Sequence, residues 1–317
     1  MSCAFIFPGQ GSQKVGMFSA FTNGFNAGMK VIEEVEDAIS FKISRLIEEG
    51  PIEELTKTEY AQPAIFAVTM ACIAVLEKEY GFNIQKNLQY LAGHSLGEYS
   101  ALCASGAIPL YEAAKLVKDR GRLMADACPN GSSEFSMASI LGIGVAAVEE
   151  IVAPFQCGKN ICVIANDNSA TQVVISGHAI AVKEVSEKAK EAGAGRVIEL
   201  NTSGPFHSPL MVKAAIGFDK ALSACLNVSD LKVPVLMNLT AEPLANKDDL
   251  HSMLVRHLTE RVRWRETIQY LMDKKIDRII EIGPCKKLSS MISRDYPYAD
   301  VCTIETVAQM EEFVKLS

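Results

Sequence analysis

A serine between two glycines is the residue of this chain whose setting most clearly suggests chemistry. Ser95 stands in the stretch GHSLG, which follows an apolar run and precedes a helical pattern. This order of strand, Gly-x-Ser-x-Gly and helix is that of a nucleophile elbow, a sharp turn that lifts a serine hydroxyl off a sheet. Gly93 and Gly97 remove side chains that would clash in the turn, and the N–H of Leu96 points to where an oxyanion would form. The pattern predicts acyl chemistry at Ser95, with a plain strand-to-helix turn as the alternative.

A serine nucleophile needs a base, and the chain has five histidines. His207 lies in the segment NTSGPFHSPLM, after a predicted strand and just before a helix predicted from Pro209. A loop at the end of a strand is where such a base is expected. The other four are a neighbour of the serine, one residue of a separate small domain and two on a predicted helix: His94, His178, His251 and His257. Elimination and position favour His207 as the base, with a helix-entry residue as the alternative. No acidic partner is apparent, and a backbone carbonyl could orient the imidazole instead.

A helix predicted from Pro109 to about Ala127 carries an arginine on its apolar face. Arg120 falls in the middle of a helically spaced stripe made of Ala113, Leu116, Val117, Met124 and Ala127. An arginine buried without a partner is very costly. Two interpretations stay open from the helix alone. One is a structural ion pair with an internal carboxylate, and the other is a guanidinium fork that receives the carboxylate of a ligand.

The segment PGQGSQKVG after the first predicted strand is glycine-rich, so it must be tested as a phosphate loop. It lacks the GxxxxGK[ST] pattern, and the third position of a GxGxxG fingerprint is Lys14. We therefore expect Gly9 and Gly11 to let the backbone pass close to a site, with Gln10 presenting its N–H or its amide. A plain turn is the alternative.

The predicted elements around these residues indicate a parallel α/β sheet and a separate ferredoxin-like unit. Cys3–Phe7 and Leu88–Ala92 are predicted strands, and an apolar helix is expected to begin at Pro63 and to end before Gly81. Strands that alternate with helices predict a parallel sheet covered on both faces. Between about residues 130 and 200 the order is β-α-β-β-α-β, with a polar turn at Asp167–Ala170, which is typical of a ferredoxin-like unit.

Composition excludes several classes of protein. The net charge of −7 over 317 residues argues against a nucleic-acid binder. We expect no apolar run of the ~20 residues that a membrane span needs, and the N-terminus lacks a basic region of the kind that opens a signal peptide. The nine cysteines are scattered without a CxxC pair, which indicates reduced thiols in a cytoplasmic protein. Cys157 and Cys162 lack nearby histidines, so we expect no metal site.

Eight motifs in order carry a resemblance to a known family. They are FIFPGQGSQKVGM, TEYAQPAIF, AGHSLGEYSAL, RGRLM, NDNSATQVVISG, GPFHSPLM, VRW and EIGP. On these motifs the chain resembles, nearly end to end, the malonyl-CoA:acyl carrier protein transacylases of type II fatty-acid synthesis. The resemblance implies that Ser95 is acylated and that His207 is its base. It also implies an oxyanion hole from Gln10 and the N–H of Leu96, and it favours Arg120 as the clamp for the free carboxylate of malonate.

The resemblance also locates three distinctive residues. Phe206, before the histidine, is the version found in malonyl-selective members, so a branched methylmalonyl group should fit less well. His257 stands where the family usually has glutamine, at a position whose main-chain carbonyl is thought to orient the catalytic histidine. Cys285 replaces the last glycine of a GPG motif. The imidazole of His257, if it lies near that of His207, could perturb the catalytic histidine.

The expected fold is α/β, with an α/β-hydrolase-like large domain (residues 1–129 and 202–317) and an inserted ferredoxin-like domain (residues 130–201). The expected function is ping-pong transfer of malonyl from malonyl-CoA to the phosphopantetheine thiol of acyl carrier protein, without metal or tightly bound cofactor, by a cytoplasmic monomer that binds neither nucleic acid nor membrane. The carrier is typically acidic, so Lys286, Lys287 and Arg294 are candidates for its docking patch, with a solvated face as the alternative. Rival functions are a stand-alone polyketide-synthase acyltransferase, a serine hydrolase or thioesterase, and a non-catalytic binding module.

Overall fold

The large part of the molecule is built on a parallel five-stranded sheet. The computed structural model describes residues 2–17, 19–128 and 133–316. The strand order is β7-β2-β1-β8-β9, and every recorded pairing is parallel. The bounds are β1 (Cys3–Phe7), β2 (Leu88–Gly93), β7 (Val235–Leu236), β8 (Arg278–Ile282) and β9 (Asp300–Ile304). The predicted parallel sheet is thus confirmed.

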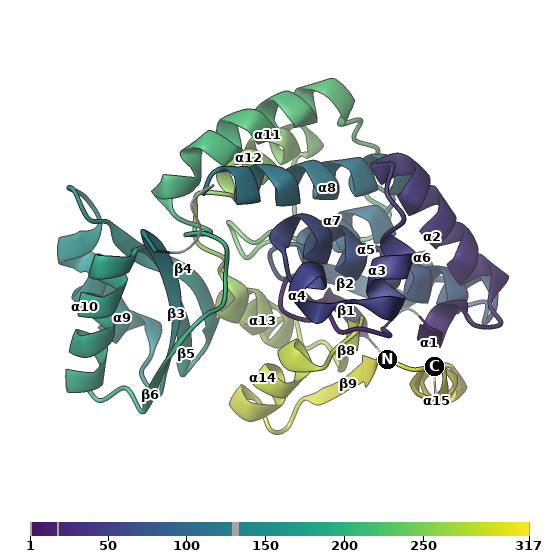
Figure 1. Ribbon diagram of the computed structural model, residues 1–317. Helices are drawn as coiled ribbons and strands as arrows, with labels where there is room; N and C mark the ends of the chain where they lie inside the picture. The colour runs from purple at the N-terminus through teal and green to yellow at the C-terminus, as the bar shows by residue number, and fades with distance from the viewer. Residues whose placement is uncertain (1, 18, 129–132, 317) are drawn as a thin grey trace.

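Helices cover both faces of this sheet (Figure 1). They are α1 (Ser19–Thr22), α2 (Asn26–Ile39), α3 (Ile43–Glu49), α4 (Ile52–Leu55), α5 (Thr58–Lys78), α6 (Ile84–Asn87), α7 (Gly97–Ala104), α8 (Leu110–Asp126), α11 (Val212–Cys225), α12 (Leu250–Arg256), α13 (Trp264–Asp273), α14 (Lys287–Asp295) and α15 (Val307–Leu316), with short 3₁₀ turns at η2 (Pro209–Met211) and η3 (Lys247–Asp249). Strand β1 divides the core by alternation. Phe5 and Phe7 pack with α5 and α8, whereas Ala4 and Ile6 pack with α13 and α14.

The central helix α5 differs from its prediction at its start. Pro63 lies inside the helix, which begins at Thr58. Thr58 and Ala61 are buried, so tertiary contacts stabilise an extra first turn that the proline rule did not anticipate. The expectation that no apolar run has the length of a membrane span was also wrong. Helix α5 is long and apolar enough by length and composition, but 83% of its apolar window is buried inside the fold, so it is the core helix of this domain.

The smaller part is an antiparallel four-stranded sheet with two helices on it. Its elements are β3 (Phe135–Leu141), α9 (Val145–Val152), η1 (Ala153–Phe155), β4 (Cys162–Ser169), β5 (Gln172–His178), α10 (Ala179–Glu191) and β6 (Arg196–Glu199). The order β4-β5-β3-β6 is that of a ferredoxin-like sheet, and β3 pairs with both β5 and β6. The predicted polar turn at Asp167–Ala170 was too long, because β4 continues to Ser169. The expected domain boundary at 129–130 lies outside the described residues.

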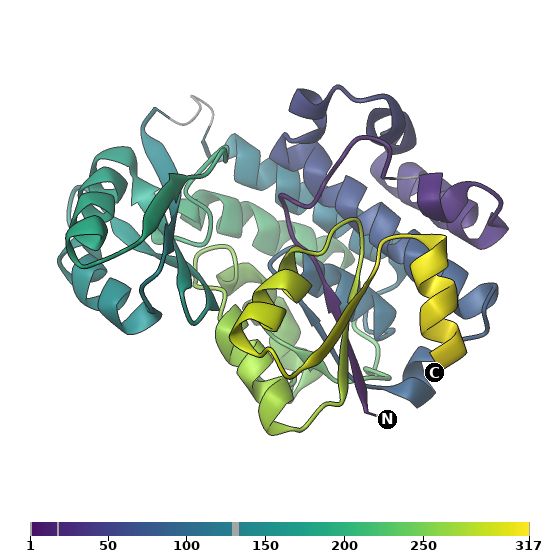
Figure 2. The ribbon, with the colours of Figure 1, turned by 90° about the horizontal axis from the view of Figure 1, so that it is seen from below.

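Strand β4 joins the two parts. Asn166 forms a parallel bridge with Val262, supported by Asp167 N–H to Val262 O (2.9 Å) and Val262 N–H to Ala165 O (2.8 Å). The buried carboxylate of Asp167 accepts hydrogen bonds from both Nε (3.0 and 3.1 Å) and Nη2 (2.9 Å) of Arg265 on α13. Figure 2 shows the small part beside the large one, with both chain termini on the large part. These contacts hold the small sheet against the carboxyl ends of the parallel strands.

Candidate active site

Ser95 sits on a strained turn between β2 and α7. Its φ angle is 51°, which is left-handed and unfavourable for a residue with a side chain. Glycine is required on both sides of it. A Cβ on Gly93 would lie 1.9 Å from the carbonyl carbon of Gly97, and a Cβ on Gly97 would lie 2.2 Å from Phe7 O. The side chain of Asn238 fixes the turn by accepting the N–H of Ser95 (2.8 Å). The geometry is that of the predicted elbow.

His207 faces the serine. Its Nε2 lies 2.8 Å from Ser95 Oγ, and its Nδ1 lies 2.8 Å from the main-chain carbonyl of His257. A carbonyl can only accept, so Nδ1 carries the proton and Nε2 is left to accept the serine proton. Burial and the neighbouring side chains of His257, Arg120 and His94 lower the pKa of His207 well below 6.5. The imidazole is therefore neutral at pH 7, as a general base must be.

The orienting group of His207 separates this site from a Ser-His-Asp hydrolase. In such a triad a carboxylate accepts the Nδ1 proton of the histidine. Here the acceptor is the carbonyl of residue 257, at the end of α12. The sequence left this choice open, and the structure favours the backbone alternative over an acidic partner.

Arg120 reaches the serine from α8. Its side chain is 1% exposed, with Nη1 donating to Gln62 Oε1 (2.7 Å) and Nη2 to Ser95 Oγ (3.1 Å). The guanidinium lies over the ring of Tyr99 at 5.6 Å. Among the residues that the structure describes, Arg120 forms no ion pair, so the structural ion pair considered from the sequence is wrong. A buried cation that has no ion-pair partner in the described ranges, beside the predicted nucleophile, suits an anionic ligand.

The predicted oxyanion donors lie on two neighbouring segments. In the described part of the chain, neither the N–H of Gln10 nor that of Leu96 has a hydrogen-bond acceptor. The side-chain amide of Gln10 instead donates to Thr58 Oγ1 (3.0 Å), which also lies 2.7 Å from Ser203 Oγ. The Gln10 side chain is thus held, and its N–H remains available. Close packing explains Gly9, because a Cβ there would lie 2.5 Å from His94 O, whereas Gly11 has a positive φ of 93°.

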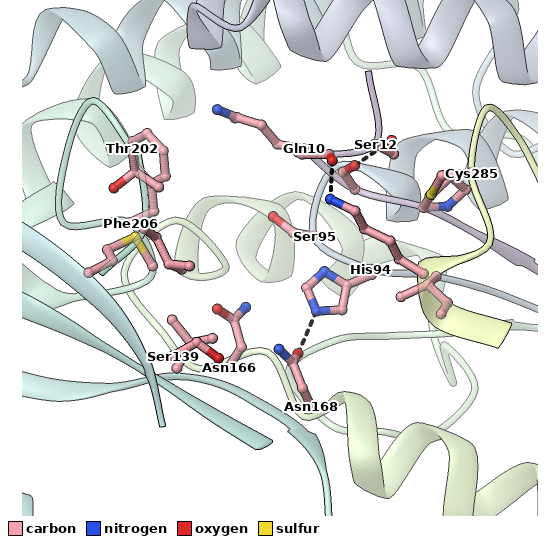
Figure 3. A pocket seen from close by; sticks show the side chains of 18 of the residues that line it. Gln10, Ser12, His94, Ser95, Ser139, Asn166, Asn168, Thr202, Phe206 and Cys285 are labelled. Carbon is pink, nitrogen blue, oxygen red and sulfur yellow. Dashed lines mark hydrogen bonds between the residues drawn. The ribbon is translucent and has the colours of Figure 1, made fainter. Parts of the chain in front are cut away.

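Gln10, Ser95, Arg120 and His207 line a pocket of about 630 Å³ between the two sheets. Figure 3 shows Ser95 near the centre, with Phe206 on the side of the small domain, Gln10 above Ser95 and Asn166 below it. The small domain contributes a patch of polar and apolar side chains: Met137, Ser139, Asn166, Asn168, Gln172 and Val174. The volume suits a small-molecule substrate.

The two departures from the family pattern lie in or beside the site. Cys285 lines the pocket, and its Sγ lies 3.5 Å from the buried Glu281 Oε1. Burial and the neighbouring carboxylate raise the pKa of this thiol to about 12, so it is protonated and a weak nucleophile. His257 is fully buried, and its ring centroid lies 5.0 Å from that of His207.

The remaining predicted residues also border the pocket. Phe206 is 6% exposed and contributes to the wall. Lys286, Lys287 and Arg294 line its rim, and the ammonium of Lys287 contacts Gly11 O. His178 and His251 lie elsewhere. His178 is the last residue of β5. His251, on α12, lies 2.7 Å from the carboxylate of Asp219 on α11.

Sequence reasoning missed four residues that support the site. Gln62 binds Arg120, Asn168 binds His94 (2.7 Å), and Asn238 connects Ser95 to Glu98. Asn238 follows β7, so the rule that active sites lie at the carboxyl ends of parallel strands could have found it. Glu98 is an acidic residue in an otherwise apolar helix, which is the signal that identified Arg120.

Comparisons with known proteins agree with this geometry. The family model described as the acyl transferase domain matches residues 4–313. The malonyl CoA-acyl carrier protein transacylase of Bacillus subtilis (strain 168) is 42% identical over 291 residues, 92% of this chain and 89% of that protein. That of Staphylococcus aureus (strain MRSA252) is 36% identical over 315 residues, 98% of both chains.

Solved structures show the same likeness. The acyl-carrier-protein-S-malonyltransferase of Bartonella henselae has a TM-score of 0.94 and 42% identity, covering 100% of this chain and 99% of that one. A malonyl-transacylase in complex with a type II PKS acyl-carrier protein has a TM-score of 0.94 and 32% identity over all of both chains. The expected fold and the expected family are confirmed, and the chain belongs to the acyl transferase family.

Proposed function

We propose that this acyltransferase moves the malonyl group of malonyl-CoA to the phosphopantetheine thiol of an acyl carrier protein through a malonyl-Ser95 intermediate. The observation that carries the proposal is the buried guanidinium of Arg120, 3.1 Å from Ser95 Oγ and without an ion-pair partner among the described residues. Malonyl has a free carboxylate at the end opposite its thioester. A guanidinium can hold that carboxylate through two hydrogen bonds while the thioester carbon meets the serine.

In the first half-reaction Ser95 Oγ attacks the thioester carbonyl carbon and His207 Nε2 takes the hydroxyl proton. The oxyanion receives hydrogen bonds from the N–H groups of Gln10 and Leu96. When the C–S bond breaks, His207 returns the proton to the leaving coenzyme A sulfur. The carbonyl of residue 257 holds Nδ1–H throughout, so the tautomer needed for both steps is preserved.

In the second half-reaction the carrier thiol occupies the place that coenzyme A has left. His207 takes the thiol proton, the sulfur attacks the malonyl-serine ester, and Ser95 regains its proton as the C–O bond breaks. This chemistry uses only side chains and main-chain groups of the chain, without a metal or a bound cofactor.

The names of the relatives support malonyl as the acyl group and a carrier protein as the acceptor. One relative is described with the carrier protein of a type II PKS, so a polyketide carrier is the alternative acceptor. We propose the carrier of fatty-acid synthesis, in keeping with the motifs. A comparison of transfer rates to the two carriers decides between them.

We further propose a cytoplasmic enzyme that acts as a monomer. Thiols such as Cys72, Cys103 and Cys128 are free, as is usual in a reducing compartment. Light scattering across a concentration series tests the monomer, since a mass that doubles would contradict it.

The direct test is the intact mass of the protein and of a phosphopantetheinylated carrier after incubation with malonyl-CoA. The wild type should gain one malonyl group and pass it to the carrier. Ser95→Ala should gain none, whereas Ser186→Ala, a serine variant on the distant helix α10, should behave as wild type. Coenzyme A release without carrier, at the rate seen with carrier, would instead identify a thioesterase.

A further inference from the structure

A closed chain of contacts links the nucleophile to the base through two residues outside the Ser95–His207 pair. The N–H of Ser95 donates to Asn238 Oδ1 (2.8 Å), and Asn238 donates to Glu98 Oε1 from its N–H (2.7 Å) and Nδ2 (3.0 Å). Glu98 Oε2 lies 2.8 Å from His257 Nδ1. The carbonyl of His257 accepts from His207 Nδ1 (2.8 Å), and His207 returns to Ser95.

Burial makes the contact between Glu98 and His257 important. Glu98 is 1% exposed and His257 is fully buried. The only ion pair of Glu98 among the described residues is with His257. A buried carboxylate without a compensating partner is costly, so this contact fixes where both side chains lie. Since the side chain and the carbonyl of His257 belong to one residue at the end of α12, an anchored side chain also anchors the carbonyl.

We propose that the side chains of Glu98 and His257 form a positioning pair for the base: they hold the carbonyl of residue 257 against His207 and tie it, through Asn238, to the turn of Ser95. The proposal rests on the proposed function for its physiological readout. It assigns a role to the His257 side chain, where a main-chain role alone would make that side chain irrelevant.

The second effect of the pair is electrostatic. The charged or titratable groups acting on His207 are His257, Arg120 and His94, and Glu98 lies behind His257. After burial, His257 contributes most to the lowered pKa of His207. Neither ring nitrogen of His257 has a hydrogen-bond partner in the described ranges, so its 2.8 Å approach to Glu98 is a close contact between Nδ1 and Oε2. Loss of this imidazole should therefore raise the pKa of His207.

Single variants at each position and one double variant test the pair. His257→Leu removes the imidazole that contacts Glu98 and should lower kcat for acylation of Ser95 by about 10- to 100-fold, the range seen when outer partners that orient a metal-bound histidine are lost. His257→Gln can still donate to Glu98 through its amide, so the decrease in kcat should be smaller than in His257→Leu. Glu98→Gln with His257→Leu should cost less than the two single changes multiplied, because no buried charge is left unpaired.

The pH profile separates positioning from mere stability. In His257→Gln the acid limb of kcat/KM should move to higher pH, because the imidazole that lowers the pKa of His207 is gone. The matched control is His251→Gln, a histidine on the same helix whose partner is the half-exposed Asp219. It should leave the profile unchanged. A His257→Gln profile that coincides with that of His251→Gln, or independent effects in the double variant, would overturn the proposal.

Two acyl donors are used so that failure of the proposed function can be told apart from failure of the proposed positioning pair. Acylation is followed with malonyl-CoA and, in parallel, with 4-nitrophenyl acetate, whose burst reports on Ser95 and His207 for any physiological acyl group. No malonyl transfer by wild type would reject the proposed function, while the acetate burst would still test the pair. If His257→Leu does not fold, the burst and pH profile of His257→Gln carry the test.

Discussion

Arg120 and Ser95 share a direct hydrogen bond of 3.1 Å, from Nη2 to Oγ, although Arg120 lies on helix α8 and Ser95 on the turn between β2 and α7. The other arm of the guanidinium is held by Gln62. The cation is therefore fixed in place before any substrate arrives. Its positive charge is left to bind the carboxylate of a ligand. Preorganised charge of this kind favours a substrate that carries the opposite charge.

Replacing Arg120 with alanine should lower kcat/KM for malonyl-CoA by at least about 30-fold, since loss of one partner of a buried charge pair costs about 2–5 kcal/mol. The kcat/KM for acetyl-CoA should fall little or should rise. The measurement is the ratio of the two kcat/KM values. Arg122→Ala serves as the control, because Arg122 lies on the exposed face of α8 and pairs with Asp119 and Asp126. An unchanged ratio in Arg120→Ala would reject the carboxylate clamp.

The acid limb of the wild-type pH profile should lie well below pH 6.5. The folded enzyme holds the pKa of His207 below that ordinary value, so the imidazole stays unprotonated, and active as a base, as the pH falls through 6.5. The measurement is kcat/KM for acylation between pH 4 and 8, at fixed ionic strength. A midpoint at or above 6.5 would contradict the lowering of the pKa of His207 by burial and by its neighbours.

Acid should also destabilise the fold in the same range. Burial lowers the pKa of His94 to about 4, whereas a histidine in the unfolded chain titrates near 6.5. Below pH 6.5 the unfolded state therefore binds more protons, so stability is complete above 6.5 and falls as the pH drops toward 4. The thermal midpoint should decline across this window. His94→Gln should show a shallower decline, and an equal slope in both proteins would count against the assignment.

Phe206 should limit the acyl group to unbranched malonyl. It is a buried wall of the pocket beside Ser95, and one additional methyl in an apolar pocket changes selectivity by about 10- to 200-fold. Phe206→Ala should raise the ratio of methylmalonyl to malonyl transfer by roughly tenfold. Phe135→Ala, a phenylalanine variant of the small sheet away from the pocket, should keep the wild-type ratio. If neither variant changes it, selectivity arises elsewhere.

The rim residues Lys286 and Arg294 should contribute to docking of an acidic carrier protein. The double change to alanine should raise KM for the carrier about 3- to 10-fold at low salt, since rim charges contribute modestly and are screened. KM for malonyl-CoA should change less. Lys190→Ala, on the far helix α10, is the control. A carrier KM that is insensitive to salt in the wild type would rule out electrostatic docking.

The sequence predicted the alternation of strands and helices because apolar period and glycine position are local signals. Helix α8 begins after Pro109 as expected, and β1 has its expected bounds. The start of α5 was wrong because contacts from distant segments stabilise its first turn around Thr58. Local rules cannot include partners that only the folded chain brings together.

The same distinction applies to the site. Ser95 and Arg120 each carry a local signal, a glycine pair and a charge on an apolar stripe. Glu98 and Asn238 acquire their importance from each other, across 140 positions of sequence. A fixed spacing cannot encode such a pair, and only the chain's three-dimensional path makes it visible. The left-handed φ of His207, 55°, was likewise invisible, since no glycine marks it.

The contacts between β4 and the segment that leads into α13 determine which parts of this protein can be exchanged with those of its relatives. The bridge of Asn166 with Val262 and the pair of Asp167 with Arg265 belong half to the inserted sheet and half to its host. A chimera that exchanged residues 130–201 alone would separate these halves. An exchange that also carried Val262 and Arg265 would keep them together, so the transferable unit is larger than the insertion and discontinuous in sequence.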